Sequence, residues 1–194
     1  MTRVWKITIP KSVTEIGRGA FYYCSSLSEV VFEEGSTLRT IEREAFYCCR
    51  YLTKVNLPEG LKSIEYSAFS YCERLKNIRL PDGLEKIGVE CFRYSGLEKI
   101  VLPASVREVS SRAFSQCERL KSVCLNDGLE KLGAEETIDG KQYGGGVFAK
   151  SAIESVRLPP TLKRLERITF HDCKNLKSIE IPHGVEYIGQ ACLY

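Results

Sequence analysis

The sequence has little of several residue types that specialised proteins depend on. Its 194 residues include one methionine, one tryptophan and two histidines. No apolar run approaches the about 18 residues that suggest a membrane-spanning helix. Basic and acidic side chains nearly balance, 28 against 25, which argues against a dedicated nucleic-acid binder with its usual basic excess. With 43% apolar and 27% charged residues, the chain is globular rather than disordered.

The start of the chain carries no visible targeting signal. Residues 1–9, MTRVWKITI, lack the apolar stretch of a secretory signal peptide. We therefore expect no membrane insertion, and secretion would require a signal that was removed or that lies upstream.

What the sequence does have is internal repetition. A unit reading L-x-x-[IV]-x-[IL]-P-x-x-[LV]-x-x-I-x-x-x-A-F-x-x-C-x-x recurs along the chain. Its openings lie at Val4, Leu27, Leu52, Leu75, Leu97, Leu120, Ile153 and Leu176. The spacings are 23, 25, 23, 22, 23, 33 and 23 residues. One such unit cannot bury its own apolar side but stacked units can, so the pattern predicts a solenoid.

Each part of the unit predicts a local structure. Alternation in segments such as Ile78-Arg79-Leu80 indicates a short strand with one buried face. The proline that often follows ends strand pairing because it has no N–H donor. A turn and a second short apolar pair, such as Leu61 and Ile64, come next. The A-F-x-x-C segment then suits one helical or 3₁₀ turn with an inward face.

These residues resemble the BspA-like leucine-rich-repeat family. Ile7–Pro10, Val13, Ile16-Gly17, Ala20-Phe21 and Cys24 match its pattern I-P-x-x-V-x-x-I-G-x-x-A-F-x-x-C almost position by position. The resemblance implies an α/β leucine-rich-repeat solenoid of about eight 23-residue repeats. It has a curved parallel β-sheet on the concave face, with short strands and 3₁₀ or helical turns on the other side. It also implies a bacterial or protozoan protein, at the cell surface or secreted, that takes part in adhesion.

We treat residues 1–194 as a single solenoid domain with an insertion at 134–147 in the sixth repeat. Solenoids normally finish in polar caps, yet here units begin by Val4 and stop at Leu193-Tyr194. We therefore expect either a fragment of a longer array or end-to-end self-association.

Nine cysteines are many for this composition, and seven of them occupy core positions of the repeat. We expect these seven to be reduced and buried, since adjacent parallel rungs keep Cβ atoms about 4.8 Å apart, beyond the roughly 3.8 Å of a disulfide. They are Cys24, Cys49, Cys72, Cys117 and Cys173 at the Cys position, and Cys91 and Cys192 at the Ala position. Cys48 and Cys124 fall outside these positions and are expected to be exposed or half-exposed. No metal or other cofactor is predicted, because there is no C-x-x-C and the two histidines lie in separate units.

The outward positions of the first strand offer one candidate binding surface. Lys54, Arg79 and Lys99 fall on three consecutive rungs and would form a modest positive stripe, with Asn56 and Val101 beside them. A polyanion could bind such a stripe. The alternative, which we favour, is that these side chains only solubilise an exposed sheet.

Tyrosines offer a second candidate surface. Seven of ten lie in the first four units, and Tyr23, Tyr71 and Tyr94 share the position before the Cys position, in a row interrupted by Cys48. Aromatic rows are typical of interfaces, but tyrosines can equally cover a solenoid's turns while their hydroxyls stay hydrated. The sequence favours neither interpretation.

The insertion is a third candidate. Asp139-Gly140, between Thr137-Ile138 and Lys141–Tyr143, predicts a small hairpin, and Gly144–Gly146 a flexible return. Such insertions map to loops that sometimes bind partners. We favour a tolerated excursion over a binding loop.

Function follows less directly than fold. We expect a noncatalytic module for protein–protein interaction or adhesion, with a host or extracellular protein as partner and no specific nucleic acid. No catalytic residues are predicted, because no Ser/His/Asp group or paired carboxylates stand out. Polyanion or carbohydrate binding and a self-associating spacer are the alternatives. The candidate partner-binding residues are Lys54, Asn56, Arg79, Lys99, Val101, Tyr23, Tyr71, Tyr94 and Tyr143.

Overall fold

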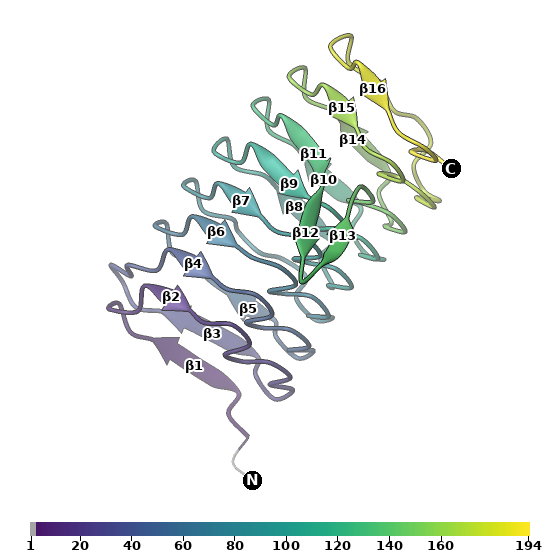
Figure 1. The fold of residues 1–194 in the computed structure, drawn as a ribbon. Coiled ribbons are helices and arrows are strands. Elements are labelled where there is room, and N and C mark those ends of the chain that lie inside the picture. Colours follow the sequence, from purple (N-terminus) through teal and green to yellow (C-terminus); the bar gives the residue numbers. More distant parts are fainter. Residues whose placement is uncertain (1–2) are drawn as a thin grey trace.

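The chain is wound into a stack of turns whose strands form parallel sheets on two faces (Figure 1). The computed structural model describes residues 3–194. The two ends of the chain lie at opposite ends of the stack. The predicted solenoid with its period of about 23 residues is confirmed.

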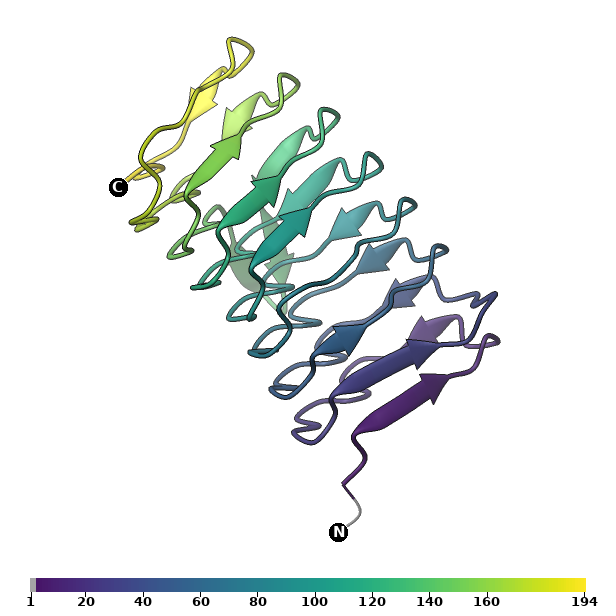
Figure 2. The same ribbon diagram turned by 180° about the vertical axis from the view of Figure 1, so that it is seen from behind.

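The first strand of each unit forms one face, seen in the foreground of Figure 2. These strands are β1 (Lys6–Ile9), β3 (Glu29–Phe32), β5 (Lys54–Val55), β8 (Lys99–Val101), β10 (Ser122–Cys124) and β14 (Ser155–Arg157). They make two separate three-stranded sheets, β1-β3-β5 and β8-β10-β14, rather than the single continuous sheet expected here. In the fourth unit only an isolated bridge, Asn56 to Arg79, is formed within the described residues.

The second apolar pair of each unit forms the other face and the longer sheet. Its strands are β2 (Glu15–Ile16), β4 (Thr40–Ile41), β6 (Ser63–Ile64), β7 (Lys86–Ile87), β9 (Glu108–Ser110), β11 (Lys131–Ala134), β15 (Arg164–Leu165) and β16 (Tyr187–Ile188). All eight pair in sequence order into one parallel sheet. The continuous sheet is therefore built from the shorter strands, with Ile16, Ile41 and Ile64 in register.

The predicted helical turn in the A-F-x-x-C segment is wrong. Residues 3–194 contain no helix, and this segment is a run of β-turns instead. In the first unit the N–H groups of Ala20, Tyr22 and Cys24 donate to carbonyls three residues earlier, at 3.0–3.1 Å. The alternate N–H groups of Gly19, Phe21 and Tyr23 donate to the next unit, at 2.8–2.9 Å. In a 3₁₀ helix every N–H would donate within the helix. Here every second N–H donates to the next unit instead, so no helix forms.

This alternation requires two left-handed residues in most units, four positions apart. Their φ values lie between 51° and 66°. The earlier position is taken by Gly19, Glu44, Ser67, Glu90, Arg112, Gly146, Ile168 and Ala191, and the later one by Tyr23, Cys48, Tyr71, Tyr94, Gln116, Lys150 and Asp172. Most are not glycine, so the fold retains an unfavourable backbone conformation at many points.

The core is a set of side-chain columns running along the stack. The clearest column is a row of phenylalanines with ring centroids 5.1–5.8 Å apart and interplanar angles of 2–18°. Its members are Phe21, Phe46, Phe69, Phe92, Phe114, Phe148 and Phe170. Offset stacking of this kind adds to the burial energy of each ring.

Cysteine thiols form a second column beside the phenylalanines. Cys49, Cys117 and Cys173 each donate a thiol hydrogen bond to the preceding unit's phenylalanine carbonyl, at 3.1 Å. All nine cysteines are unpaired, and six of the seven at core positions are buried, with Cys24 half-buried. Burial raises the pKa of the Cys49 thiol to about 12, so this thiol stays protonated and can donate.

Of the two cysteines outside the core positions, Cys124 is exposed as expected, but the expectation for Cys48 is wrong. Cys48 is buried, 3% exposed, at a left-handed position of the second unit.

We expect truncation of Phe92 to break the phenylalanine column at its centre. Phe92 is fully buried between Phe69 and Phe114, at 5.5 and 5.4 Å. Phe92→Ala should lower the free energy of unfolding by about 3–5 kcal/mol. Urea denaturation measures this, with Phe32→Ala, at a half-buried ring outside the column, as control. Equal losses for the two variants would contradict a special role of the column.

We expect glycine to stabilise a left-handed position. Lys150 has φ 60° and an exposed side chain. Lys150→Gly removes a steric penalty of about 1–2 kcal/mol and adds about 0.5–1 kcal/mol of unfolded-state entropy, a net gain of roughly 0.5–1 kcal/mol. Lys174→Gly, at an exposed turn residue without positive φ, should lower the melting temperature instead. A fall in both variants would disprove the left-handed assignment.

Candidate binding surfaces

Five tyrosines form one continuous cluster on the turn side of the first four units. We call Tyr22, Tyr23, Tyr47, Tyr71 and Tyr94 the tyrosine edge. Tyr22 stacks on Tyr47 at 5.1 Å, and Tyr71 stacks on Tyr94 at 4.5 Å. Tyr47 joins the two pairs, 5.8 Å from Tyr23 and 5.5 Å from Tyr71. The edge is therefore a single aromatic surface rather than scattered rings.

The predicted row of Tyr23, Tyr71 and Tyr94 has the correct register, but the expected interruption at Cys48 is filled. Tyr47, one residue earlier, fills the gap that Cys48 leaves between Tyr23 and Tyr71. Sequence reasoning missed Tyr47 because it lies in a different column, shared with Tyr22. The signal was present in that Tyr22 and Tyr47 hold the same position in consecutive units.

The rings of the edge are partly exposed. Tyr22 and Tyr23 are 48% and 56% exposed, while Tyr47, Tyr71 and Tyr94 are half-buried. Burial raises the pKa of Tyr47 to about 12. The guanidinium of Arg93 lies over the Tyr94 ring, 4.9 Å from its centroid. Rigid aromatic area next to arginine is the typical composition of an interface hot spot.

The insertion forms the predicted hairpin, which lies along the outside of the stack. Strands β12 (Glu136–Ile138) and β13 (Lys141–Tyr143) pair antiparallel around Asp139-Gly140. In Figure 1 the hairpin lies in front of the eight-stranded sheet, and in Figure 2 behind it. Its tip reaches back to the second unit, where Asp139 forms an ion pair with Arg43 at 2.5 Å.

Further contacts hold the hairpin along its length. The hydroxyl groups of Tyr143 and Tyr66 lie 3.2 Å apart, and Lys86 reaches Glu136 at 3.6 Å. The Ser110 hydroxyl also donates to Glu136. Burial and the hydrogen bond with Tyr143 raise the pKa of Tyr66. The hairpin is thus packed against the second to fifth units.

The expected flexible return at Gly144–Gly146 is also wrong. All three glycines are buried. Gly145 accepts the Arg112 N–H at 3.0 Å, and the Gly146 N–H donates to Arg167 at 2.9 Å. A Cβ at Gly145 would collide with the Arg167 carbonyl oxygen. The return is therefore a hydrogen-bonded rung of the stack in which the Gly145 position accepts only glycine.

The positive stripe is less continuous than its spacing suggested. Lys54 lies 2.9 Å from Glu29, which it shares with Lys6, and Arg79 lies 2.5 Å from Glu59, so two of the three cations have an acidic partner. Register also separates them, because Arg79 aligns with Asn56 rather than with Lys54.

Of the three stripe cations, only Lys99 has no ion-pair partner in the part of the chain that the structure describes. It borders a hollow of about 360 Å³ with Arg79 and the exposed Val101, where the first-strand face is divided.

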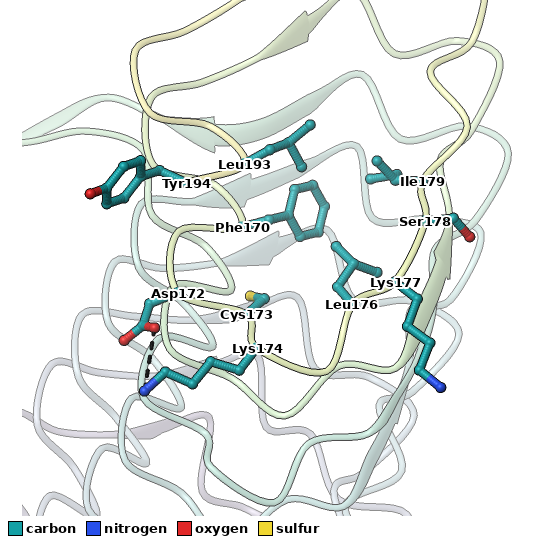
Figure 3. Close-up of a pocket in the computed structure, with 10 residues that line it drawn as sticks. All are labelled: Phe170, Asp172, Cys173, Lys174, Leu176, Lys177, Ser178, Ile179, Leu193 and Tyr194. Carbon is teal, nitrogen blue, oxygen red and sulfur yellow. Dashed lines mark ion pairs between the residues drawn. The ribbon is translucent and has the colours of Figure 1, made fainter.

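Two further hollows carry no site. One of about 980 Å³ lies on the eight-stranded sheet beside the hairpin, where Lys131 pairs with Glu108 and Arg164 with Glu166. The other, of about 420 Å³, lies at the last turns and is lined by the buried Phe170 and the exposed Leu193 (Figure 3). Among residues 3–194 no group of three or more His, Cys, Asp or Glu side chains is placed to hold a metal ion. Over the same residues, no helix is long and apolar enough to cross a membrane.

Comparison with known families identifies the repeat. Residues 1–121 and 140–194 match the family described as BspA type Leucine rich repeat region, in six copies. The unmatched residues 122–139 include the first hairpin strand and part of the tip. No protein of curated function matches the chain.

Several solved bacterial structures share the fold. A leucine-rich repeat protein from Bacteroides ovatus is 32% identical over 95% of this chain and 47% of its own, with a TM-score of 0.83. The T. pallidum leucine-rich repeat protein is 29% identical over 97% of this chain and 74% of its own, with a TM-score of 0.69. A leucine rich cell surface protein from Faecalibacterium prausnitzii is 26% identical, over 95% and 56%, with a TM-score of 0.54. This chain thus spans about half the length of the Bacteroides protein.

We expect the Asp139–Arg43 ion pair to hold the tip of the hairpin. Asp139→Asn should speed amide hydrogen exchange in residues 136–143, because the neutral amide loses the charge-assisted bond to Arg43. Asp127→Asn is the matched control, since Asp127 is equally exposed and pairs with Arg157 at 2.7 Å elsewhere. Equal exchange in the hairpin of both variants would show that the tip contact does not hold it.

The same contact predicts a pH dependence. The hydrogen bond from Arg43 lowers the pKa of Asp139 below its ordinary 3.8. A depressed carboxyl pKa stabilises the folded state above the unfolded pKa, and that stabilisation is lost as pH falls through the folded-state value. Hairpin protection should therefore be unchanged from pH 7 to 5 and decline only below about 4.

Proposed function

The chain belongs to the BspA-type leucine-rich repeat family, and from this premise we propose that it is a noncatalytic module that binds a protein partner. The tyrosine edge is the surface proposed for this contact. A role in adhesion at the cell surface is part of the proposal, by analogy with the relative from Faecalibacterium prausnitzii that is described as a leucine rich cell surface protein.

The observation that carries the proposal is the continuity of the tyrosine edge. Five rings touch in one cluster, two of them about half exposed. Three of the rings, Tyr23, Tyr71 and Tyr94, extend from left-handed backbone positions within a hydrogen-bonded stack. A backbone fixed in this way limits the conformational freedom that is lost on binding. Preorganised tyrosine offers large contact area at low entropic cost.

The first-strand face supports a partner contact less well. Lys54 and Arg79 already have acidic neighbours, and salt-bridged side chains must give up these contacts before they bind another anion. This also weakens polyanion binding as a competing function. Asn56, Lys99 and Val101 are proposed only as peripheral contacts.

We expect substitutions in the tyrosine edge to weaken partner binding. Peptides selected from a random display library on the immobilised protein would serve as probes, with affinities measured by surface plasmon resonance. Tyr23→Ser with Tyr71→Ser should weaken binding at least tenfold, about 1.4 kcal/mol, because two hot-spot rings are lost.

Tyr187→Ser is the control, since Tyr187 is 42% exposed and lies in β16 of the eight-stranded sheet, outside the tyrosine edge. Selection of peptides whose affinity is unchanged by the double substitution and reduced by the control would contradict the proposal. Thermal unfolding of each variant establishes that the loss is not due to misfolding.

A further inference from the structure

Two arginines share one carboxylate oxygen where the tyrosine edge meets the hairpin. Glu90 is buried, 7% exposed, and its Oε1 accepts hydrogen bonds from Arg93 at 3.1 Å and from Arg112 at 3.3 Å. Neither arginine has another acidic partner among residues 3–194. The pair of guanidinium groups is therefore only half neutralised.

The surroundings add positive charge rather than remove it. Lys141 of the hairpin lies 5.1 Å from the centroid of the Tyr143 ring, which Arg112 also covers at 5.6 Å. Glu136, the hairpin's own carboxylate, is already engaged by Lys86 and Ser110. Lys141 thus shares the Tyr143 ring with Arg112, one of the two cationic partners of Glu90.

The two guanidinium groups retain unused donors. Each uses only its Nη1 in the bond to Glu90, although a guanidinium has five N–H donors. Arg93 Nε is buried and has no hydrogen-bond partner. The side chains are 27% and 31% exposed, so they are partly desolvated yet reachable, which strengthens pairing with an incoming anion.

The position of these donors links them to the tyrosine edge. Arg93 lies over the Tyr94 ring, and Tyr94 stacks on Tyr71. Arg112 lies over Tyr143 on the hairpin side. A chain segment lying on the tyrosine rings would therefore reach the arginine pair at one end of the edge.

We propose that the tyrosine edge receives an acidic segment of its protein partner, one carboxylate of which binds between Arg93 and Arg112. This rests on the proposed function and adds the chemistry of the partner. An Asp or Glu side chain fits a planar guanidinium in two-point geometry, and apolar or aromatic neighbours of that residue would contact the tyrosines. Glu90 acts as a positioning residue that holds the two arginines at the required spacing.

The test uses the peptides selected on the full chain in a double-substitution cycle. The protein is compared as wild type, Arg93→Gln and Arg74→Gln. Arg74 is the matched control, because it stacks on Tyr51 at 4.2 Å and does not contact Glu90. Each peptide is compared with a version in which Asp and Glu are replaced by Asn and Gln.

We expect the selected peptides to be enriched in Asp and Glu, and neutralised peptides to bind wild type at least tenfold more weakly. On Arg93→Gln the acidic and neutral peptides should differ by less than threefold, whereas Arg74→Gln should behave like wild type. Arg112→Gln, which leaves Arg93 with Glu90, provides a second variant should Arg93→Gln fail to fold.

The outcomes separate this inference from the proposed function. Peptides that depend on Tyr23 and Tyr71 but show no acidic enrichment would overturn the inference and leave the protein-binding function standing. Peptides insensitive to the tyrosine substitutions would refute the proposed function itself. Heparin that binds independently of those tyrosines but requires Arg93 would mark a general polyanion contact and also overturn the inference.

Discussion

The alternation of backbone donors in the turn segment is the constraint on which the rest of the structure depends. One N–H in two closes a turn within its own unit, and the next is given to the following unit. An N–H that donates to the next unit cannot also form a helical hydrogen bond, so the segment remains a chain of turns. The left-handed positions follow directly, because each successive turn has to reverse the local twist. Residues as unsuited as Ile168 and Cys48 accept this conformation, which means that inter-unit hydrogen bonding outweighs their backbone preference.

Because the units stack in register, each position of the repeat forms a column of side chains along the stack. The places where a column changes residue type mark the distinctive features of this protein. In two units the segment between the Phe position and the start of the next unit is one residue shorter, at Ser95-Gly96 and Ser151-Ala152. In both units serine occupies the position of the core cysteine. Each of these serines lies within 3.3–3.5 Å of the next unit's cysteine sulfur, so the polar column continues through the shorter turn. A Cβ at Gly96 would collide with the Glu73 carbonyl, which explains glycine in the first of the two. The columns therefore tolerate a deletion only with a matched change of residue.

Much of the fold could be predicted from the sequence because its period is explicit. Strand positions, the buried cysteines and the hairpin at Asp139-Gly140 follow from alternation and turn chemistry. The turn segment could not be predicted correctly, since Ala, Phe and Cys at spacings of one and three fit a helix equally well. The site was predicted only in part: Tyr23, Tyr71 and Tyr94 align as expected, but Tyr47 joins them from a neighbouring column. Lys54 and Glu29 lie in neighbouring units on the same face. Their ion pair depends on how far each side chain extends, which the repeat period does not predict.

The hairpin shows how a solenoid can gain a feature without losing its register. It leaves the stack after β11 and the ladder resumes at Gly145 and Gly146. At Gly145 the absent side chain lets the backbone approach the Arg167 carbonyl. Because the ladder is restored, the excursion changes no column before or after it. Its contacts instead extend sideways, from Asp139 to Arg43 and from Tyr143 to the guanidinium of Arg112. Arg112 is also the second partner of Glu90, so the insertion and the tyrosine edge meet at one buried carboxylate. Removing Arg93 or Arg112 would leave Glu90 with a single cation, and the cost of an undercompensated buried charge couples the two arginines.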